Sequence, residues 1–267
     1  MLRINNVTKI FNKGTNNEQL ALENVNLHLE KGDFVTMIGG NGAGKSTLLN
    51  AISGIFLVDS GRIALDGKDI TFQREYRRAR QMGRLFQDPL KGTAPNMTIA
   101  ENLSLAYLRG SGRGVAIGLR GRERNLFREK LSRLELGLED RLDTKMGLLS
   151  GGQRQAVTLL MATIVTPKLL MLDEHTAALD PATGKKVLEL TKSVVAGDRI
   201  TTLMITHNIT SALELGNRTI MLDAGRIILD ISGEEREQMT VEKLMLLFRQ
   251  KQGKHLDNDR MLLQKDI

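Results

Sequence analysis

A glycine-rich segment near the start of the chain has the residue types and spacing needed to hold phosphate groups. The apolar run FVTMI at 34–38 leads into GGNGAGKS at 39–46, and a second apolar stretch follows. This GxxxxGK[ST] pattern, placed between an expected strand and an expected helix, is typical of nucleotide-binding loops. The glycines let backbone N–H groups turn toward phosphate oxygens, and the N-terminus of the next helix adds partial positive charge. The loop residues expected to contact a nucleotide are Gly39, Asn41, Gly42, Ala43, Gly44, Lys45, Ser46 and Thr47.

Two side chains of this loop have distinct expected roles. We expect Lys45 to contact the β- and γ-phosphates. We expect the hydroxyl of Ser46 to bind Mg²⁺, whose charge offsets the charge that develops on the transferred phosphoryl group. The loop therefore predicts a nucleotide together with Mg²⁺ as its ligands.

A pair of carboxylates could handle the metal and the attacking water. The apolar residues 169–172 form an expected buried strand that ends in Asp173 and Glu174. We expect Asp173 to hold Mg²⁺ directly or through water, and Glu174 to orient and deprotonate the attacking water. An acidic pair after a strand is by itself more often a helix cap. Its occurrence together with the phosphate loop favours the catalytic interpretation.

The elements that must position these groups follow from the pattern of apolar residues. Strands are expected at 3–10, 22–29, 34–38, 169–172, 201–206, 219–222 and 226–229, with short strands near Ile63 and Ile70. Helices are expected at 46–53, 75–82, 98–108, 122–135, 152–165, 181–195, 209–215 and 241–249. The alternation predicts a parallel sheet with helices on its faces, and the run of helices before residue 166 predicts a helical insert.

Composition excludes several other classes of protein. The 267 residues carry a formal charge of +7 and are 41% hydrophobic, and none of them is cysteine. These values exclude a disordered chain, a disulfide framework, a thiolate metal site and a cysteine nucleophile. The first residues lack the apolar core of a signal peptide, and no run reaches the roughly 18 apolar residues of a membrane span. A cytosolic chain is therefore expected.

The positive charge is concentrated in two segments. Residues 74–84 contain five arginines, and residues 109–133 contain eight basic residues. A solvated helical face is the favoured interpretation, and contact with anionic lipid headgroups or an acidic partner is the alternative. Nucleic acid is disfavoured because aromatic residues, which stack on bases, make up only 3% of the chain. The glycine-rich segment 110–121 is expected to be a surface loop.

The segment Leu149-Ser150-Gly151-Gly152-Gln153 distinguishes between families that share the phosphate loop. Its serine and glycines open an expected helix and offer a hydroxyl and N–H groups to an anion, although Ser-Gly-Gly alone could be merely an N-cap. LSGGQ upstream of the acidic pair resembles the signature of ATP-binding cassette (ABC) ATPases. The resemblance implies that Ser150, Gly151, Gly152 and Gln153 meet the γ-phosphate held by another subunit, in a head-to-tail dimer that encloses two ATP molecules.

Four further residues resemble family motifs in the family's order, so that the resemblance covers residues 2–245. Gln87, in LFQDP, matches the glutamine that senses Mg²⁺ and links the core to the helical insert. Asp180, in ALD, matches the loop that communicates across the dimer. His207 matches the switch histidine that contacts the γ-phosphate, although alone it would be an ordinary capping or surface histidine. Phe11 matches the aromatic residue that stacks on adenine, although alone it would be a strand-end core residue.

Two positions depart from the family pattern. Gly40 replaces the proline or serine common at that place in the loop, which should leave the phosphate cradle intact. His175 follows Glu174 where proline is usual. Capping of the next turn is the favoured interpretation of His175, and tuning of the Glu174 carboxylate is the alternative.

The resemblance implies an α/β fold of the P-loop NTPase class. Its parts would be a RecA-like parallel-sheet core, an N-terminal antiparallel β subdomain and an inserted helical subdomain. The expected boundaries are a nucleotide-binding domain at 1–250, with its core at 1–87 and 166–240 and its helical subdomain at 88–165, and a tail at 251–267.

The implied function is Mg²⁺-dependent ATP hydrolysis that energises solute uptake through separate permease subunits, at the cytoplasmic face of the cell membrane. The segment MTIAENL at 97–103 and the basic loop after it are similar to those of amino-acid-type importers, especially branched-chain-like ones. The expected partners are a second copy or a paired cassette, integral membrane permeases and an extracytoplasmic solute-binding protein. An exporter subunit and a soluble assembly or scaffold ATPase are the alternatives.

Overall fold

Apolar strands and amphipathic helices place the predicted motifs in two units of the chain. The computed structural model describes residues 1–88, 90–109 and 121–252. The first unit joins Met1–Arg78 to Thr201–Ile267, and the second is Ala79–Ile200. Across the described ranges, no helix has both the length and the apolar content to cross a membrane.

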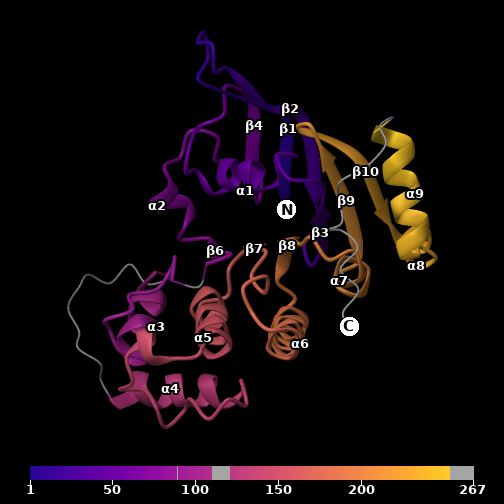
Figure 1. Cartoon of the computed structure of the whole chain (residues 1–267). Helices are drawn as coiled ribbons and strands as arrows, with labels where there is room; N and C mark the ends of the chain where they lie inside the picture. The colour runs from indigo at the N-terminus through magenta and orange to yellow at the C-terminus, as the bar shows by residue number, and fades with distance from the viewer. Residues whose placement is uncertain (89, 110–120, 253–267) are drawn as a thin grey trace. The chain divides into compact units, whose positions relative to one another are not determined.

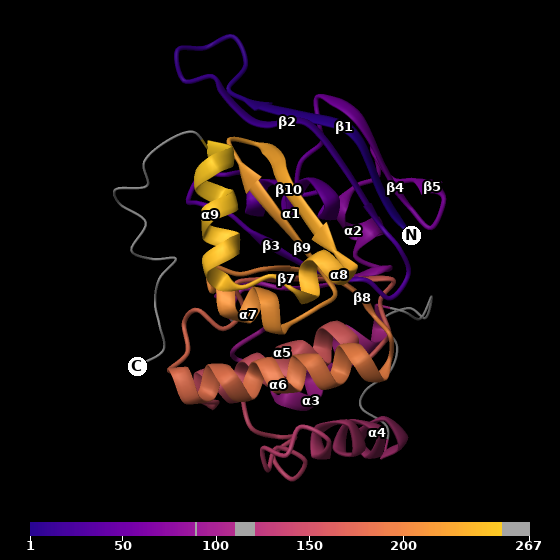
Figure 2. The same ribbon diagram turned by 90° about the vertical axis from the view of Figure 1, so that its right-hand side faces the viewer.

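An antiparallel sheet begins the first unit. Its strands, in the order β2-β1-β4-β5, are Gln19–Leu29, Leu2–Phe11, Ser60–Leu65 and Lys68–Asp69 (Figures 1 and 2). Leu2 and Ile4 of β1 are buried while Arg3 between them is exposed, so the strand turns one face to the core. The expected N-terminal antiparallel subdomain is thereby confirmed.

A second sheet of the first unit leads into the phosphate loop. Strand β3 (Phe34–Ile38) is parallel to both of its neighbours, β8 (Thr201–Ile205) and β9 (Arg218–Asp223). Strand β10 (Arg226–Ser232) is antiparallel to β9. All five residues of β3 are buried, as expected for a strand covered on both faces.

Helices of the first unit complete its core. They are α1 (Lys45–Ser53), α2 (Glu75–Arg78), α7 (Ile209–Glu214), α8 (Gly233–Glu237) and α9 (Val241–Gln252). Figure 2 shows α9 lying along β10, and its Leu244 and Phe248 are buried in a cluster with Ile231 of that strand. Helix α9 extends beyond the expected 241–249 and ends at Gln252. Residues 253–267 lie outside the described ranges.

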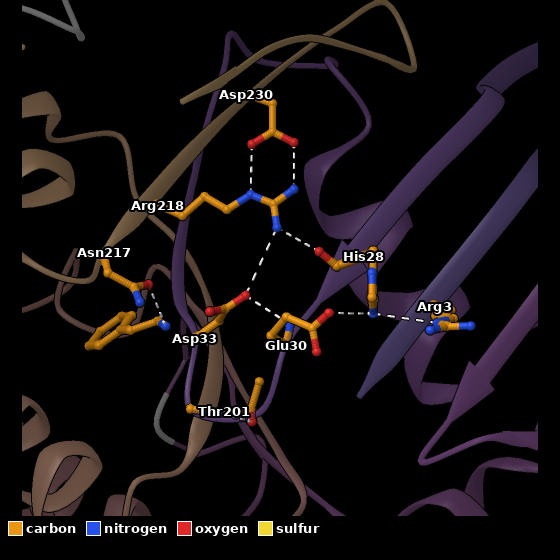
Figure 3. A network of polar contacts seen from close by, with 10 residues as sticks. Arg3, His28, Glu30, Asp33, Thr201, Asn217, Arg218 and Asp230 are labelled. Atoms are coloured by element: carbon orange, nitrogen blue, oxygen red, sulfur yellow. Dashed lines mark hydrogen bonds and ion pairs between the residues drawn. The ribbon is translucent and has the colours of Figure 1, made fainter. Parts of the chain in front are cut away.

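An ionic network fixes the turn that leads from β2 into β3 (Figure 3). Arg218 forms a bidentate pair with Asp230, with Nε to Oδ1 at 2.7 Å. The same guanidinium donates to the His28 carbonyl and lies 3.9 Å from the carboxylate of Asp33. Asp33 in turn accepts from the backbone N–H of Glu30 at 2.8 Å. These charge-assisted bonds tie the turn to β9 and β10.

The same turn is also held by uncharged hydrogen bonds (Figure 3). The hydroxyl of Thr201 accepts from the N–H of Gly32 at 2.9 Å, and the amide oxygen of Asn217 accepts from the N–H of Phe34 at 3.0 Å. The turn before β3 is fixed to β8 and β9. The position of the phosphate loop, which follows the other end of β3, is fixed as a result.

The second unit contains a parallel strand pair and a group of helices. Strands β6 (Met82–Leu85) and β7 (Leu169–Asp173) are parallel. The helices are α3 (Ile99–Leu108), α4 (Gly121–Ser132), the 3₁₀ helix η1 (Met146–Leu148), α5 (Gly151–Thr163) and α6 (Pro181–Gly197). Helices α3, α4 and α5 share a core that includes Leu103, Phe127 and Leu160 (Figure 1). The glycine-rich loop expected at 110–121 lies outside the described residues except for Gly121, which begins α4.

The expected helix at 75–82 is wrong in its second half. Helix α2 ends at Arg78, and Met82 already belongs to β6. Pairing with β7 buries Met82 and Leu85, and Gly83 allows a backbone approach that no other residue permits: a Cβ there would lie 2.6 Å from the Ala162 carbonyl oxygen. Tertiary contacts therefore make a strand of a sequence with little β propensity.

Two arginines of the basic segments donate hydrogen bonds to the carbonyls at helix ends. Arg78 is buried, and its Nη1 donates at 2.8 Å to two carbonyls at the end of α1. Arg109 donates to the carbonyl of Ala162 at 2.9 Å, near the end of α5. Cations at these carbonyls satisfy acceptors that the helix itself leaves unbonded. The interpretation of 74–84 as a solvated helical face is therefore wrong for Arg78.

Candidate nucleotide-binding site

The phosphate loop of the first unit has backbone angles that require glycine. Gly39, Gly42 and Gly44 have φ of 150°, 78° and 100°. A Cβ on Gly39 would lie 2.2 Å from the carbonyl oxygen of Leu222, and one on Gly44 would lie 2.8 Å from that of Ala21. The loop backbone therefore packs closely against neighbouring segments, and a side chain at Gly39 or Gly44 would clash with them.

The loop opens directly into helix α1. Gly44 is the N-cap residue, no side chain caps the helix, and Lys45 is its first residue. The buried Lys45 ammonium donates to the carbonyls of Gly39 and Gly40 at 2.8 and 3.0 Å, so its charge lies over the loop. Asn41 is exposed.

The remaining loop side chains differ in exposure. Ser46 is exposed, Thr47 is half-buried and Ala43 is buried. A lysine, a hydroxyl and a helix N-terminus together suit the binding of a polyanion.

A turn that the sequence analysis did not identify is hydrogen-bonded to the phosphate loop. Between β9 and β10, Gly225 donates its N–H to the carbonyl of Ala43 at 3.0 Å. A Cβ on Gly225 would lie 2.8 Å from the carbonyl oxygen of Ala21, so this position also needs glycine. Ala224 and Gly225 have φ of 44° and 77° in this turn. The glycine between two apolar runs was the only signal of it in the sequence.

His207 lies at the same edge of the sheet as the phosphate loop. It follows β8, and Met37 of β3 is paired with Ile205, two residues before the histidine. The next residue, Asn208, caps α7 by accepting from the N–H of Ser211 at 2.9 Å. Asn208, and not His207, is therefore the residue that caps this helix. His207 is half-buried at the carboxyl edge of the sheet, where α/β sheets bind ligands.

Phe11 ends strand β1 and is half-buried. Its ring packs edge-on against Phe56, with ring centroids 5.2 Å apart, and the Lys9 ammonium lies 5.5 Å from its centroid. This ring forms an aromatic pair beside a cation, and its stacking on adenine stays a prediction.

The second unit brings Asp173 and Gln87 to one edge of its strand pair. Leu85 pairs with Leu172, so Asp173, the last residue of β7, and Gln87, two residues after β6, lie at the carboxyl ends of adjacent parallel strands. Asp173 is half-buried and Gln87 is exposed in the loop after β6. The strand register therefore places both residues at one edge of the strand pair, and their binding of Mg²⁺ stays a prediction.

Arg84 contacts Asp173, and the sequence analysis did not predict this contact. Its Nη2 lies 3.4 Å from Oδ2 of Asp173, and its guanidinium lies 4.6 Å from the ring centroid of Phe86. The sequence analysis placed this residue in the basic segment 74–84, but its side chain is only 12% exposed. Its position three residues before Gln87 was the available signal.

His175 neither caps the next turn nor faces solvent. It is 2% exposed, and its Nε2 lies 3.1 Å from the hydroxyl of Thr191 in α6. Burial lowers the pKa of the imidazole from 6.5 to about 4, so the ring is neutral near pH 7. The favoured interpretation as a cap is therefore wrong: this side chain belongs to the core.

The signature segment opens helix α5 with a reciprocal cap. Ser150 Oγ accepts from the N–H of Gln153 at 3.3 Å, and Gln153 Oε1 accepts from the N–H of Ser150 at 3.2 Å. This capping box confirms the N-cap interpretation of Ser150. Because its oxygen accepts here, the hydroxyl can still donate its own proton to an anion.

Close packing joins the signature segment to the residues around Asp180. A Cβ on the buried Gly152 would lie 2.1 Å from Cγ2 of Thr183, and one on Gly151 would lie 3.1 Å from Leu179. Asp180 is the N-cap of α6 and accepts from the N–H of Thr183 at 3.0 Å. Hydrogen bonding by the side chain and then the backbone of Thr183 lowers the pKa of its carboxyl. Two predicted motifs are therefore neighbours within this unit.

Comparisons with known proteins point to one family. The family model described as ABC transporter matches residues 22–177. The tyrosine transport ATP-binding protein of Clostridioides difficile (strain R20291) is 46% identical over 248 residues, which cover 93% of this chain and 98% of that protein. The methionine import ATP-binding protein MetN of Haemophilus influenzae (strain 86-028NP) is 35% identical over 233 residues, which cover 85% of this chain and 64% of that protein.

A solved structure shares the fold. The ATP-binding cassette MJ0796, determined as a dimer in a post-hydrolysis state with ADP and Pi, has a TM-score of 0.74 and is 31% identical. The match covers 87% of this chain and 98% of that one. The expected α/β fold of the P-loop class is thereby confirmed. The chain belongs to the ABC transporter family, as one of its ATP-hydrolysing subunits.

Proposed function

We propose that this ATPase drives the uptake of an amino acid, with tyrosine as the first candidate, through separate membrane subunits. The observation that supports this most is the 46% identity to a tyrosine transport ATP-binding protein over nearly the whole of both chains. A second relative, 35% identical, is also named for import of an amino acid, methionine. The branched-chain preference expected from sequence gives way to an aromatic amino acid as the substrate to test first.

ATP binding is assigned to the glycine loop and the residues around it. Lys45 and the N–H groups from Gly39 to Thr47 bind the β- and γ-phosphates, because they offer an ammonium and a helix N-terminus at one place. Phe11 stacks on adenine. Glu174 orients the attacking water and removes its proton, and His207 contacts the γ-phosphate.

The residues assigned to Mg²⁺ are Ser46, Gln87 and Asp173. They offer a hydroxyl, an amide oxygen and a carboxylate, the hard oxygen donors that this ion prefers. Over the described part of the chain, no group of three or more His, Asp or Glu side chains gathers in a way that could hold a metal. One carboxylate is sufficient beside the Ser46 hydroxyl and the Gln87 amide oxygen, because nucleotide phosphates supply further oxygen ligands. When bound, the ion would withdraw charge from the transferred phosphoryl group.

Two cassettes are proposed to close head to tail on two ATP molecules. Ser150, Gly151, Gly152 and Gln153 of one chain meet the γ-phosphate bound by Lys45 of the other, and Asp180 contacts the partner chain. The dimeric form of MJ0796 supports such pairing. Hydrolysis removes the γ-phosphate contacts and lets the dimer reopen. Permeases and an extracytoplasmic solute-binding protein complete the transporter, with this chain at the cytoplasmic face of the membrane.

The decisive experiment purifies the tagged chain with its stoichiometric partners in mild detergent and reconstitutes the complex in vesicles. ATP is supplied on the side of this subunit, and transport of labelled tyrosine and methionine is measured. ATP-driven uptake of tyrosine supports the proposal. Movement of solute in the opposite direction would assign an exporter, and copurification of soluble partners alone would assign an assembly ATPase.

Two variants test the roles within the ATP site. Glu174→Gln should lower turnover by about 10²- to 10⁴-fold while ATP still binds, because the amide cannot accept the proton of the attacking water. Lys45→Ala should instead weaken ATP binding, measured by equilibrium titration with a fluorescent ATP analogue. Near-normal hydrolysis by the first variant, or unchanged affinity in the second, would contradict the assigned roles.

A further inference from the structure

The backbone of Glu174 has an unfavourable conformation that its neighbours must maintain. Its φ is 46°, in the left-handed region, which is unfavourable for a residue with a Cβ. The turn closes when Ala177 donates its N–H to the Glu174 carbonyl at 3.0 Å. On one side of Glu174, strand β7 is held by its pairing with β6. The other side needs an anchor of its own.

His175 provides that anchor by bonding to helix α6. The hydroxyl of Thr191 donates to the carbonyl of Val187 at 2.8 Å, so its single proton is already used. In the contact of 3.1 Å, His175 Nε2 must therefore carry the hydrogen and donate it to Thr191 Oγ1. Both side chains are buried, at 2% and 0% exposure. A buried donor that lost this partner would carry the full cost of desolvation.

The anchored turn follows the buried face of α6. That face consists of Gly184, Val187, Thr191 and Val195. A Cβ on Gly184 would be in ordinary contact, at 3.8 Å, with Cβ of Thr176. The two residues after Glu174 thus rest on one stripe of α6, the helix whose first turn packs against the signature glycine Gly152.

We propose that His175 is a positioning residue, which fixes the direction of the Glu174 carboxylate by anchoring its turn to Thr191. The inference rests on the proposed role of Glu174 in ATP hydrolysis. A side chain that activates water must be held within a fraction of an ångström, and Glu174 adopts a backbone angle that it would not keep unaided. Through the same bond, α6 links the catalytic turn to the signature segment and to Asp180.

The test is Thr191→Val in the full chain, which removes the hydroxyl and keeps the shape. ATPase rates give kcat and KM, and thermal unfolding gives stability. Thr163→Val is the matched control, because Thr163 is also buried in a helix and donates to the carbonyl four residues earlier at 2.8 Å, in α5. We expect kcat to fall roughly tenfold or more in Thr191→Val, with KM for ATP within about twofold of wild type. Thr163→Val should lower thermal stability without lowering kcat.

Two more variants guard against a simple folding defect. His175→Leu removes the donor without leaving a buried N–H unbonded, and it should show the same loss of kcat. Thr191→Ser keeps the hydroxyl and should restore at least half of the wild-type kcat. Equal kcat in Thr191→Val and Thr163→Val, or no rescue by serine, overturns the positioning role. Failure of the proposed function is a distinct result. In that case the wild-type chain would hydrolyse no ATP, or Glu174→Gln would hydrolyse it at a near-normal rate.

Discussion

At the scale of single residues, the buried imidazole of His175 makes stability depend on pH. Its pKa is lowered to about 4 by burial alone, whereas in the unfolded chain it is near 6.5. Above pH 6.5 the ring is neutral in both states. As the pH falls from 6.5 toward 4, only the unfolded chain takes up the proton, so stability is lost across this window, by up to about 3 kcal/mol.

The measurement is the free energy of unfolding in urea from pH 7.5 to 4.5, without nucleotide, for wild type and His175→Gln. Carboxylates titrate in both proteins, so the difference between the two curves isolates the histidine. We expect the wild type to lose more stability than the variant as the pH falls. Parallel curves would show that the imidazole is protonated as easily in the folded chain as in water.

At the scale of elements, the approach of α5 and α6 depends on Gly152. A Cβ there would lie 2.1 Å from Cγ2 of Thr183, a β-branched side chain with little freedom to move. Gly152→Ala should therefore destabilise the chain by about 1–3 kcal/mol. Thr183→Ser removes the obstructing methyl group, so the double variant should recover most of this loss in urea unfolding.

Gly151→Ala is the control for this pair of helices. Its Cβ would lie 3.1 Å from the end of the flexible Leu179 side chain, which can turn aside. The cost should be smaller and should not respond to Thr183→Ser. Additive effects of Gly152→Ala and Thr183→Ser, without recovery, would mean that the two positions do not constrain each other.

Elements with a clear apolar period were predictable from the sequence, and those made by tertiary contact were not. Local sequence is enough to indicate the buried strand β3 and the helix caps at Ser150 and Asp180, because the residues involved are close together in the chain. Strand β6 has no such pattern, because its pairing with β7 depends on residues almost ninety positions away. The environments of Arg78, Arg84 and His175 are invisible for the same reason: a polar side chain looks alike in sequence whether it meets water or a buried partner.

At the scale of the whole molecule, the proposed head-to-tail dimer makes each ATP site depend on two chains. Lys45 and Ser150 would act on one nucleotide from different subunits. Lys45→Ala and Ser150→Arg should each abolish turnover as homodimers, because both sites then carry the lesion. Ser150 is exposed, so arginine can be accommodated there at the cost of the helix cap, about 1 kcal/mol.

Mixing the two inactive variants distinguishes the arrangements. In a mixed dimer of twofold symmetry, one site collects both lesions and the other is intact. Random pairing makes about half of the dimers mixed, so an equal mixture should recover roughly a quarter of the wild-type rate if one intact site turns over independently. If Lys45 and Ser150 served the same nucleotide within one chain, every site would keep one lesion and the mixture would stay inactive. Recovery of ATPase rate on mixing, absent when either variant is mixed with itself, is therefore the signature of sites shared between two chains.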